Sequence, residues 1–231
     1  MNKLLTALRH VASYLLPIKR RVQSVHSGVV EVVLHEGRKV LDTAHANYSY
    51  GSLQRVLRYG LLFTEPAAPG PILVLGLGGG SVVETLRREH QATGPITAVE
   101  LDPVLIQVAD AEFGIRAGAG LDIVCADAFA WVPTAPTAEF RLVIIDLFID
   151  LDLPAGLQAP AFWQHIWRLL QPGGYVLFNT LTKDSLVVAS QDVAAYLPTV
   201  GFAVKEVEVE QYNRLLVLHK ATGNEGATFR G

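Results

Sequence analysis

The sequence is short of cysteine. Cys125 is the single cysteine among 231 residues, so the chain has no internal disulfide framework. This fits a reducing compartment, and we expect the protein in the cytoplasm. Basic residues are not in excess either, since the formal net charge at pH 7 is -3. Without a basic surface, the chain is not expected to bind nucleic acid.

Metal-ligand spacings and long hydrophobic runs are also missing. The seven histidines show no zinc-ligand spacing, and we expect no metal. No apolar stretch reaches the roughly 20 residues that cross a bilayer. Near the start, Leu4, Leu8, Val11 and Leu15 recur at helical spacing. They predict an amphipathic helix docked on the protein body or on a partner subunit, a homodimer being one arrangement. A membrane-surface helix is the alternative.

Half of the residues are hydrophobic, which is enough for one large core with a small appendage. β-Branched residues predict strands at 29–34 and 39–41, joined by a turn at Glu36-Gly37. A helical pattern follows over 47–62, and 66–71 is a proline-rich linker. We therefore expect an N-terminal helix plus small β-hairpin region over residues 1–65 and a second domain over 66–231.

The second domain alternates strands and helices. Strands are predicted at 72–75, 96–99, 121–124, 142–145 and 175–179, with helices at 81–90, 103–113, 128–131 and 161–170. This alternation predicts an α/β fold with a Rossmann-like, doubly wound, mostly parallel sheet. A helix at 185–197 and an antiparallel hairpin formed by 202–210 and 213–220 complete it.

A glycine loop paired with an acid is the most informative feature. Gly76, Gly78, Gly79 and Gly80 follow the first strand of this domain, and Glu100 ends the next strand. Such glycines let the backbone approach a ligand closely, and such an acid accepts hydrogen bonds from ribose hydroxyls. The pair predicts a nucleoside-containing cofactor. A nicotinamide dinucleotide is less favoured, because Ser81 breaks the Gly-x-Gly-x-x-Gly spacing.

Further acids stand where later strands end. Asp127 follows the third strand and Asp146 the fourth, so both belong to the same rim of the sheet as Glu100. We expect Asp127 to accept the exocyclic amine of adenine, with a helix cap as the alternative. Asp102 precedes Pro103 and is read as a helix start. Asp150 and Asp152 are by default solvated loop acids.

These motifs, with the Gln171-Pro-Gly-Gly174 turn before the fifth strand, resemble the class I S-adenosylmethionine-dependent methyltransferase fold. The hairpin and the Tyr48-Ser-Tyr50 motif make the chain most similar to the spermidine synthase-like family. The resemblance covers about residues 28–220. It implies Asp146 and Tyr50 as the groups that help deprotonate an acceptor amine. The implied cofactor-binding residues are Gly76, Gly78, Gly79, Gly80, Glu100, Asp127, Ala128 and Asp146.

Two departures from the family's aminopropyltransferases bear on the reaction. Those enzymes carry an aspartate at Gly79, which holds the amine of decarboxylated S-adenosylmethionine, and another at Ile149, which helps hold the polyamine. Without the first acid, backbone amides and the helix start at Ser81 are expected to receive the carboxylate of intact S-adenosylmethionine. Asp150 or Asp152 could compensate for the second.

We therefore expect a spermidine synthase-like transferase that uses S-adenosylmethionine, most simply a methyltransferase with an unidentified small-molecule acceptor. The alternatives are a polyamine aminopropyltransferase that uses the decarboxylated cofactor and a nucleoside-binding module without catalysis.

Overall fold

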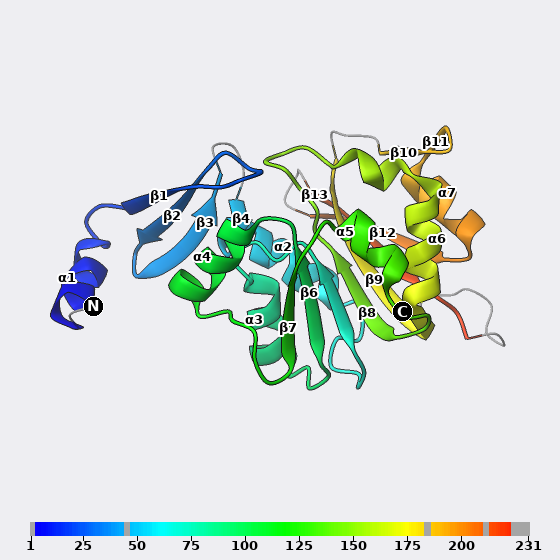
Figure 1. Cartoon of the computed structure of the whole chain (residues 1–231), viewed down its shortest axis with the longest axis horizontal. Helices are drawn as coiled ribbons and strands as arrows, with labels where there is room; N and C mark the ends of the chain where they lie inside the picture. Colours follow the sequence, from blue (N-terminus) through cyan, green and yellow to red (C-terminus); the bar gives the residue numbers. More distant parts are fainter. Residues whose placement is uncertain (1–2, 44–46, 183–185, 210–212, 223–231) are drawn as a thin grey trace.

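A seven-stranded sheet forms the centre of the molecule (Figure 1). The computed structural model describes residues 3–43, 47–182, 186–209 and 213–222. The strand order is β12-β13-β9-β8-β5-β6-β7. Five strands run parallel, namely β5 (Ile72–Leu75), β6 (Ile96–Glu100), β7 (Leu121–Cys125), β8 (Phe140–Ile145) and β9 (Leu170–Leu181). The predicted terminal hairpin is confirmed, because β13 (Asn213–His219) is antiparallel to both β9 and β12 (Ala203–Val209).

Helices cover both faces of this sheet, as the parallel strands require. On one face lie α2 (Gly51–Leu61), α3 (Ser81–Arg88) and α4 (Pro103–Phe113), which share a core with the inward side chains of β5. On the other face lie α5 (Ala128–Trp131), α6 (Pro160–Leu169) and α7 (Val193–Val200), packed around the fully buried Trp163. Short 3-10 turns at Val132–Thr134 and Ala155–Gln158 complete this second layer.

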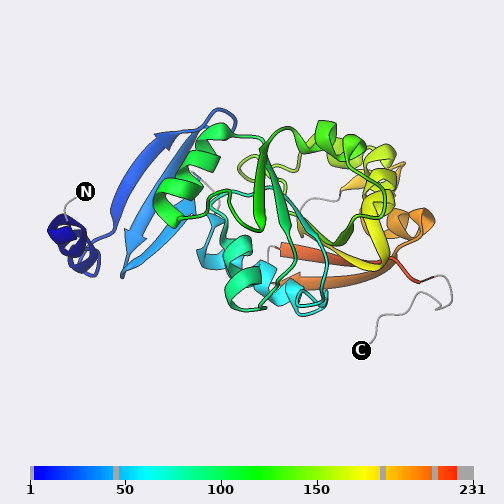
Figure 2. The ribbon, with the colours of Figure 1, turned by 60° about the horizontal axis from the view of Figure 1, so that its bottom comes forward.

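A separate antiparallel sheet stands at one end of the molecule. It consists of β1 (Ile18–Gln23), β2 (Val29–His35), β3 (Arg38–Asp42) and β4 (Asn47–Ser49). Its apolar face packs against α4, where Val30, Val32 and Leu41 meet Leu105 and Val108. Figure 2 shows the sheet beside α4. The docking of α4 therefore joins the two sheets into one structure.

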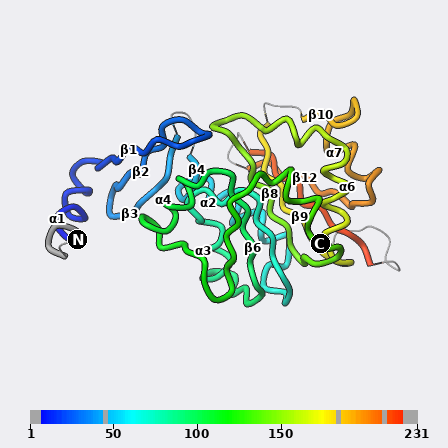
Figure 3. Tube along the Cα trace, in the orientation of Figure 1, coloured from blue at the N-terminus to red at the C-terminus, as the bar shows by residue number. Residues whose placement is uncertain are grey.

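Helix α1 (Lys3–Ala12) lies beyond this small sheet, at the edge of the trace in Figure 3. The side chains of Leu8 and Val11 are 59% and 66% exposed, so at these two positions the apolar face of α1 does not dock on the protein body as one of our expectations had it. Docking on a partner subunit stays a prediction. Among the described residues, every helix is too short or too polar to span a bilayer.

The structure adds one element and corrects two that were expected. Strand β1 was not predicted, because its burial pattern holds mainly exposed positions and its sequence is basic. The helix expected over 47–62 begins only at Gly51, since Asn47–Ser49 pairs with β3 as β4. The helix expected over 185–197 starts at Val193, after the two-stranded ribbon β10 (Val187–Val188) and β11 (Gln191–Asp192). Residue 185 lies outside the described residues.

Candidate functional site

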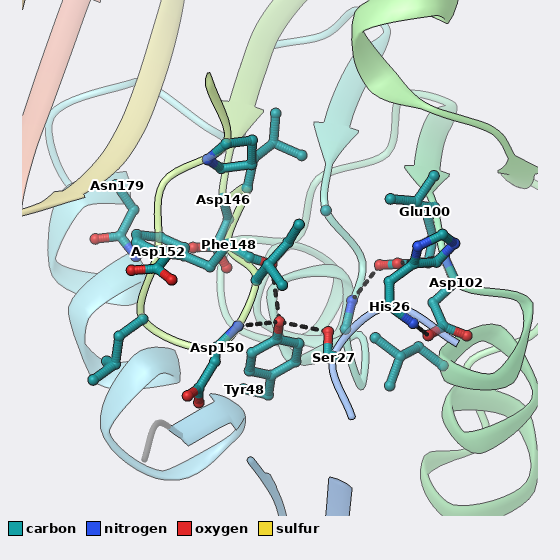
Figure 4. A pocket seen from close by; sticks show the side chains of 18 of the residues that line it. His26, Ser27, Tyr48, Glu100, Asp102, Asp146, Phe148, Asp150, Asp152 and Asn179 are labelled. Atoms are coloured by element: carbon teal, nitrogen blue, oxygen red, sulfur yellow. Dashed lines mark hydrogen bonds between the residues drawn. The ribbon is translucent and has the colours of Figure 1, made fainter. Parts of the chain in front are cut away.

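A cavity of about 790 Å³ opens at the carboxyl ends of the parallel strands. Its walls come from the glycine loop, the ends of β6, β7, β8 and β9, and the start of β13. The small sheet and α2 close it with His26, Ser27, Asn47, Tyr48 and Ser52. In Figure 4, Glu100 and His26 lie at one end and Asn179 and Asp152 at the other. The cavity therefore has two distinct ends.

The glycine loop is packed on both sides. A Cβ on Gly76 would lie 2.1 Å from the backbone oxygen of Asp146, and one on Gly78 would lie 2.9 Å from that of Tyr48. Both residues have positive φ values, of 91° and 53°, which L side chains rarely adopt. Gly76 and Gly78 line the cavity. Two independent constraints, space and dihedral angle, thus require glycine at each position.

Gly79 and Gly80 lie outside the cavity lining. A Cβ on Gly79 would meet the side chain of Ser49 at 2.8 Å, and one on Gly80 would meet Ile115 at 2.7 Å. The backbone N–H of Ser81 donates to Ser49 Oγ at 3.1 Å. The Ser81 amide is thus already engaged by the side chain of Ser49 in β4, and its predicted contact with the cofactor carboxylate, like that of Gly79, stays a prediction.

Glu100 is buried where β6 ends, and it fixes the glycine loop. Its Oε2 accepts hydrogen bonds from the N–H groups of Leu77 at 2.9 Å and Gly78 at 3.0 Å. Its Oε1 accepts from the N–H of Asp102 at 2.9 Å. Burial raises the pKa of Glu100, although these three hydrogen bonds act in the opposite direction. Glu100 faces the cavity, so its predicted ribose contact stays a prediction beside this structural role.

Asp102 ties the small sheet to the central one. It caps α4 through the N–H of Val104 at 2.8 Å, as predicted. Its Oδ2 also accepts from Ser24 Oγ and from the N–H groups of Val25 and His26 in the β1–β2 loop. Burial opposes ionisation, but these hydrogen bonds outweigh it and lower the pKa of Asp102. The carboxylate therefore holds the His26 loop over the cavity.

Asp127 and Ala128 line the cavity where α5 begins. Asp127 Oδ1 accepts from the N–H of Phe129 at 2.9 Å, which is the helix cap that the sequence left as an alternative. The cap uses one of two carboxylate oxygens, so an additional contact to adenine stays a prediction.

Asp146 follows β8 and belongs to a chain of polar side chains. Asn213 Nδ2 donates to Asn179 Oδ1 at 3.0 Å, and Asn179 Nδ2 donates to Asp146 Oδ1 at 2.8 Å. Burial raises the pKa of Asp146 to about 6, with the nearby Glu100 charge adding to the effect and Asn179 opposing it. Asp146 can therefore exchange a proton near neutral pH, which suits a group that handles an acceptor's proton.

Tyr48, not Tyr50, faces the cavity. The Tyr48 hydroxyl donates to the backbone oxygen of Phe148 at 2.9 Å, accepts from the N–H of Asp150 at 3.0 Å and lies 2.8 Å from Ser27 Oγ (Figure 4). Tyr50 stacks on Phe113 at a centroid distance of 4.5 Å and is absent from the cavity lining. Burial and the Glu84 carboxylate raise its pKa. The structure thus separates Tyr50 from Asp146.

Comparisons with known proteins find methyltransferases and polyamine aminopropyltransferases similar to this chain. A family model described as a methyltransferase domain matches residues 72–174. Polyamine aminopropyltransferase 1 of Streptomyces coelicolor is 30% identical over 165 residues, which are 66% of this chain and 30% of that protein. An eEF1A lysine and N-terminal methyltransferase homolog of Drosophila pseudoobscura pseudoobscura is 30% identical over 150 residues, 61% of this chain and 22% of that protein.

Solved structures extend the match to the small sheet. A probable spermidine synthase from Corynebacterium glutamicum superposes with a TM-score of 0.63 at 17% identity and covers 88% of this chain and 80% of its own. The fold is that of the spermidine synthase-like class I methyltransferases. Human methyltransferase-like protein 13, solved with SAH, has the same class I methyltransferase fold, with a TM-score of 0.58, 21% identity and coverages of 77% and 86%. The chain spans less than a third of the two curated relatives named above.

Sequence reasoning missed several residues of this candidate site. Asn179 is the last residue of the fifth strand as the sequence predicted it, over 175–179, so the rule that found Asp127 and Asp146 could have found it. His26, Ser27, Tyr48 and Asn213 reach the cavity through docking of the small sheet and pairing of β13. No local sequence pattern signals such contacts.

Proposed function

We propose that the chain is an S-adenosylmethionine-dependent methyltransferase acting on an amine. The observation that carries this proposal is the Asp146 carboxylate, which lines the cavity with one oxygen held by Asn179. The nucleoside of the cofactor would lie toward Glu100 and Asp127, and the acceptor toward Asn179. This arrangement supports transfer of a methyl group at the level of Asp146.

The proposed reaction is an in-line displacement. The protonated acceptor amine is attracted to Asp146 and loses a proton to it. The nitrogen lone pair then attacks the methyl carbon, the carbon–sulfur bond breaks, and its electron pair stays on sulfur as a neutral thioether. The methylated ammonium product leaves, and Asp146 releases its proton to water. Most of the rate gain would come from positioning the two reactants and excluding water.

The environment of Gly79 favours methyl over aminopropyl transfer. Because residue 79 is glycine, the loop offers no carboxylate to the amine of a decarboxylated cofactor. The Ser49 side chain occupies the space that an acid at this position would need. The cofactor carboxylate would then meet neutral donors. Ser52 in the first turn of α2 lines the cavity, and a helix start favours an anion.

Aminopropyl transfer is the second candidate, because one observation favours it. None of the lining residues that the structure describes is a lysine or arginine, and six of them are acids. Such a site lacks a cation for the cofactor carboxylate and would suit the decarboxylated form. The similarity to polyamine aminopropyltransferases agrees with this candidate.

Calorimetry with S-adenosylmethionine and its decarboxylated form tests the two candidates. We expect tighter binding of the intact cofactor, and mass spectrometry of an amine incubated with each should show addition of a methyl group only. Asp146→Asn should abolish most turnover, whereas Asp152→Asn, at the exposed mouth, should retain it. An aminopropylated product would favour the second candidate. Cofactor binding without any product would favour a non-catalytic module.

A further inference from the structure

We propose that the acceptor carries one charged nitrogen on an apolar body and is therefore a monoamine, not a polyamine. The inference rests on the proposed function and concerns the acceptor end of the same cavity. Two observations carry it, namely how the cavity acids are already engaged and which side chains form the wall beyond Asp146.

Three of the six acids that line the cavity serve the scaffold. Glu100 accepts three backbone N–H groups with its two oxygens. Asp102 caps α4 with one oxygen and binds the β1–β2 loop with the other. Asp127 caps α5. Glu100 and Asp102 have both carboxylate oxygens engaged by local donors. Asp127 keeps one oxygen, but it lies at the end of the cavity proposed for the nucleoside, so these three acids do not form a polyamine site.

Asp150 is engaged as well. Its Oδ1 accepts a hydrogen bond from Thr43 Oγ1, and its backbone N–H donates to the Tyr48 hydroxyl. Both contacts come from the small sheet, so they hold the loop after β8 against it. Asp150 is therefore not the free substitute for the missing acid at Ile149 that the sequence allowed. Asp152 is exposed at the mouth.

At the acceptor end of the cavity, Asp146 is the inner carboxylate with one oxygen available to a ligand. Its Oδ1 accepts from Asn179, and the described residues supply no donor to its Oδ2. One internal carboxylate oxygen pairs with one ammonium group. A chain of ammonium groups would need further acids at regular intervals along the cavity, and the engaged acids described above do not supply them.

Much of the wall beyond Asp146 is apolar, with Asp150 and Asp152 alternating with apolar side chains. Leu147, Phe148, Ile149, Leu151 and Leu181 all line the cavity. Ile149 and Leu151 are 41% and 44% exposed, although large apolar side chains are normally buried. The reciprocal hydrogen bonds of 3.0 Å between Ile149 and Asp152 hold the loop in shape. Exposed apolar side chains at the mouth of a cavity are typical of a surface that receives an apolar ligand.

The two observations together specify the acceptor. Its ammonium group would pair with Asp146, and its hydrocarbon part would cover Ile149 and Leu151. A second ammonium at the far end of the hydrocarbon would lie against these side chains. Taking a charge out of water without a partner is costly, so a diamine of the same length should bind more weakly.

Hexylamine and hexamethylenediamine form a matched pair of probes, since they differ only in the terminal ammonium. We expect calorimetry on the wild-type protein, saturated with S-adenosylhomocysteine, to show at least about tenfold tighter binding of hexylamine. Ile149→Asp should reduce or reverse this preference. Val187→Asp, at a comparably exposed apolar residue outside the cavity lining, should leave it unchanged.

Equal or tighter binding of the diamine to the wild type would overturn the inference, as would binding of neither amine. An unchanged preference in a folded Ile149→Asp variant would also overturn it. Product analysis with S-adenosylmethionine is scored separately. If hexylamine binds preferentially but is never methylated, the proposed methyl transfer fails while the selectivity of the cavity stands.

Discussion

Asp146 is an acid whose burial raises its pKa at a cost in stability. Its pKa is raised to about 6 because the protein around it solvates the charge less well than water does. Asn179 recovers part of that loss by donating a hydrogen bond. The carboxyl group of Asp146 therefore titrates near pH 6, where it could accept a proton from the proposed acceptor amine.

The first prediction concerns the pH dependence of turnover. Below about pH 6, Asp146 becomes neutral and no longer attracts or deprotonates the amine, so kcat/KM should fall on the acid side of that value. Asn179→Ala removes the hydrogen bond that favours the ionised form and should move this limb to higher pH. Asn213→Ala, one step further away, should move it less. If the acid limb of both variants stays at the wild-type pH, the hydrogen bonds from Asn213 through Asn179 do not influence the pKa of Asp146.

The second prediction concerns stability. Burial raises the pKa of Asp146 from 3.8 to about 6, so the free energy of unfolding falls as the pH rises through that interval. Asp146→Asn avoids the charge and can still accept from Asn179. Above pH 6 its free energy of unfolding should exceed that of the wild type by roughly 1–3 kcal/mol. The gain should shrink toward pH 4. Denaturant titrations at both ends of this range measure it, and a destabilised variant at high pH would contradict the argument.

The third prediction concerns Gly79, where related aminopropyltransferases carry an aspartate. Gly79→Asp alone should weaken binding of either cofactor, because its Cβ would lie 2.8 Å from that of Ser49 and displace β4. Combined with Ser49→Gly, the new acid has room and should shift the calorimetric preference toward decarboxylated S-adenosylmethionine. Ser49→Gly alone is the control and should not shift it. An unchanged preference in the double variant would show that this position does not sense the cofactor tail.

At the scale of elements, several segments could be predicted because their local signals agree. Helix α4 was predicted at the bounds the structure shows, with Asp102-Pro103 marking its start, and Gly114 caps its end. Strand β5 is a continuous apolar run, as is the part of β8 over residues 142–145. In contrast, β1 has no such run, and Asn47–Ser49 extends a helical pattern that pairing with β3 overrides. The elements missed are those that tertiary contacts define.

The fourth prediction concerns the junction between the two sheets. Asp102→Ala removes a helix cap and several hydrogen bonds to a carboxylate, so the free energy of unfolding should fall by roughly 2–4 kcal/mol. The His26 loop should also lose its position, which should weaken cofactor binding. Asp152→Ala, at an exposed position, is the matched control. Equal unfolding midpoints in the two variants would contradict the assigned role.

At the scale of the whole molecule, the site is wider than the domain that carries the family signature. The methyltransferase model matches residues 72–174, which hold the glycine loop, Glu100, Asp127 and Asp146. The loop and the three acids were predictable because the carboxyl ends of parallel strands lie at the same edge of a sheet. Tyr48 and Asn213 lie outside that range. The boundary between an N-terminal region and a second domain at residue 66 stays a proposal. Helix α2 lies before this boundary, yet its Val56, Leu57 and Leu61 pack into the core of the central sheet.

Because His26, Ser27 and Tyr48 form one wall of the cavity and the central sheet forms the other, a ligand acts as a removable cross-link between two sheets. By mass action, a ligand at about one hundred times its dissociation constant adds about 2.7 kcal/mol to the folded state that binds it. Amide hydrogen exchange in β1–β4 should therefore slow when the cavity is filled, while β12, at the far edge of the central sheet, should exchange as before. Hydrogen exchange in the small sheet would then report whether the cavity holds a ligand.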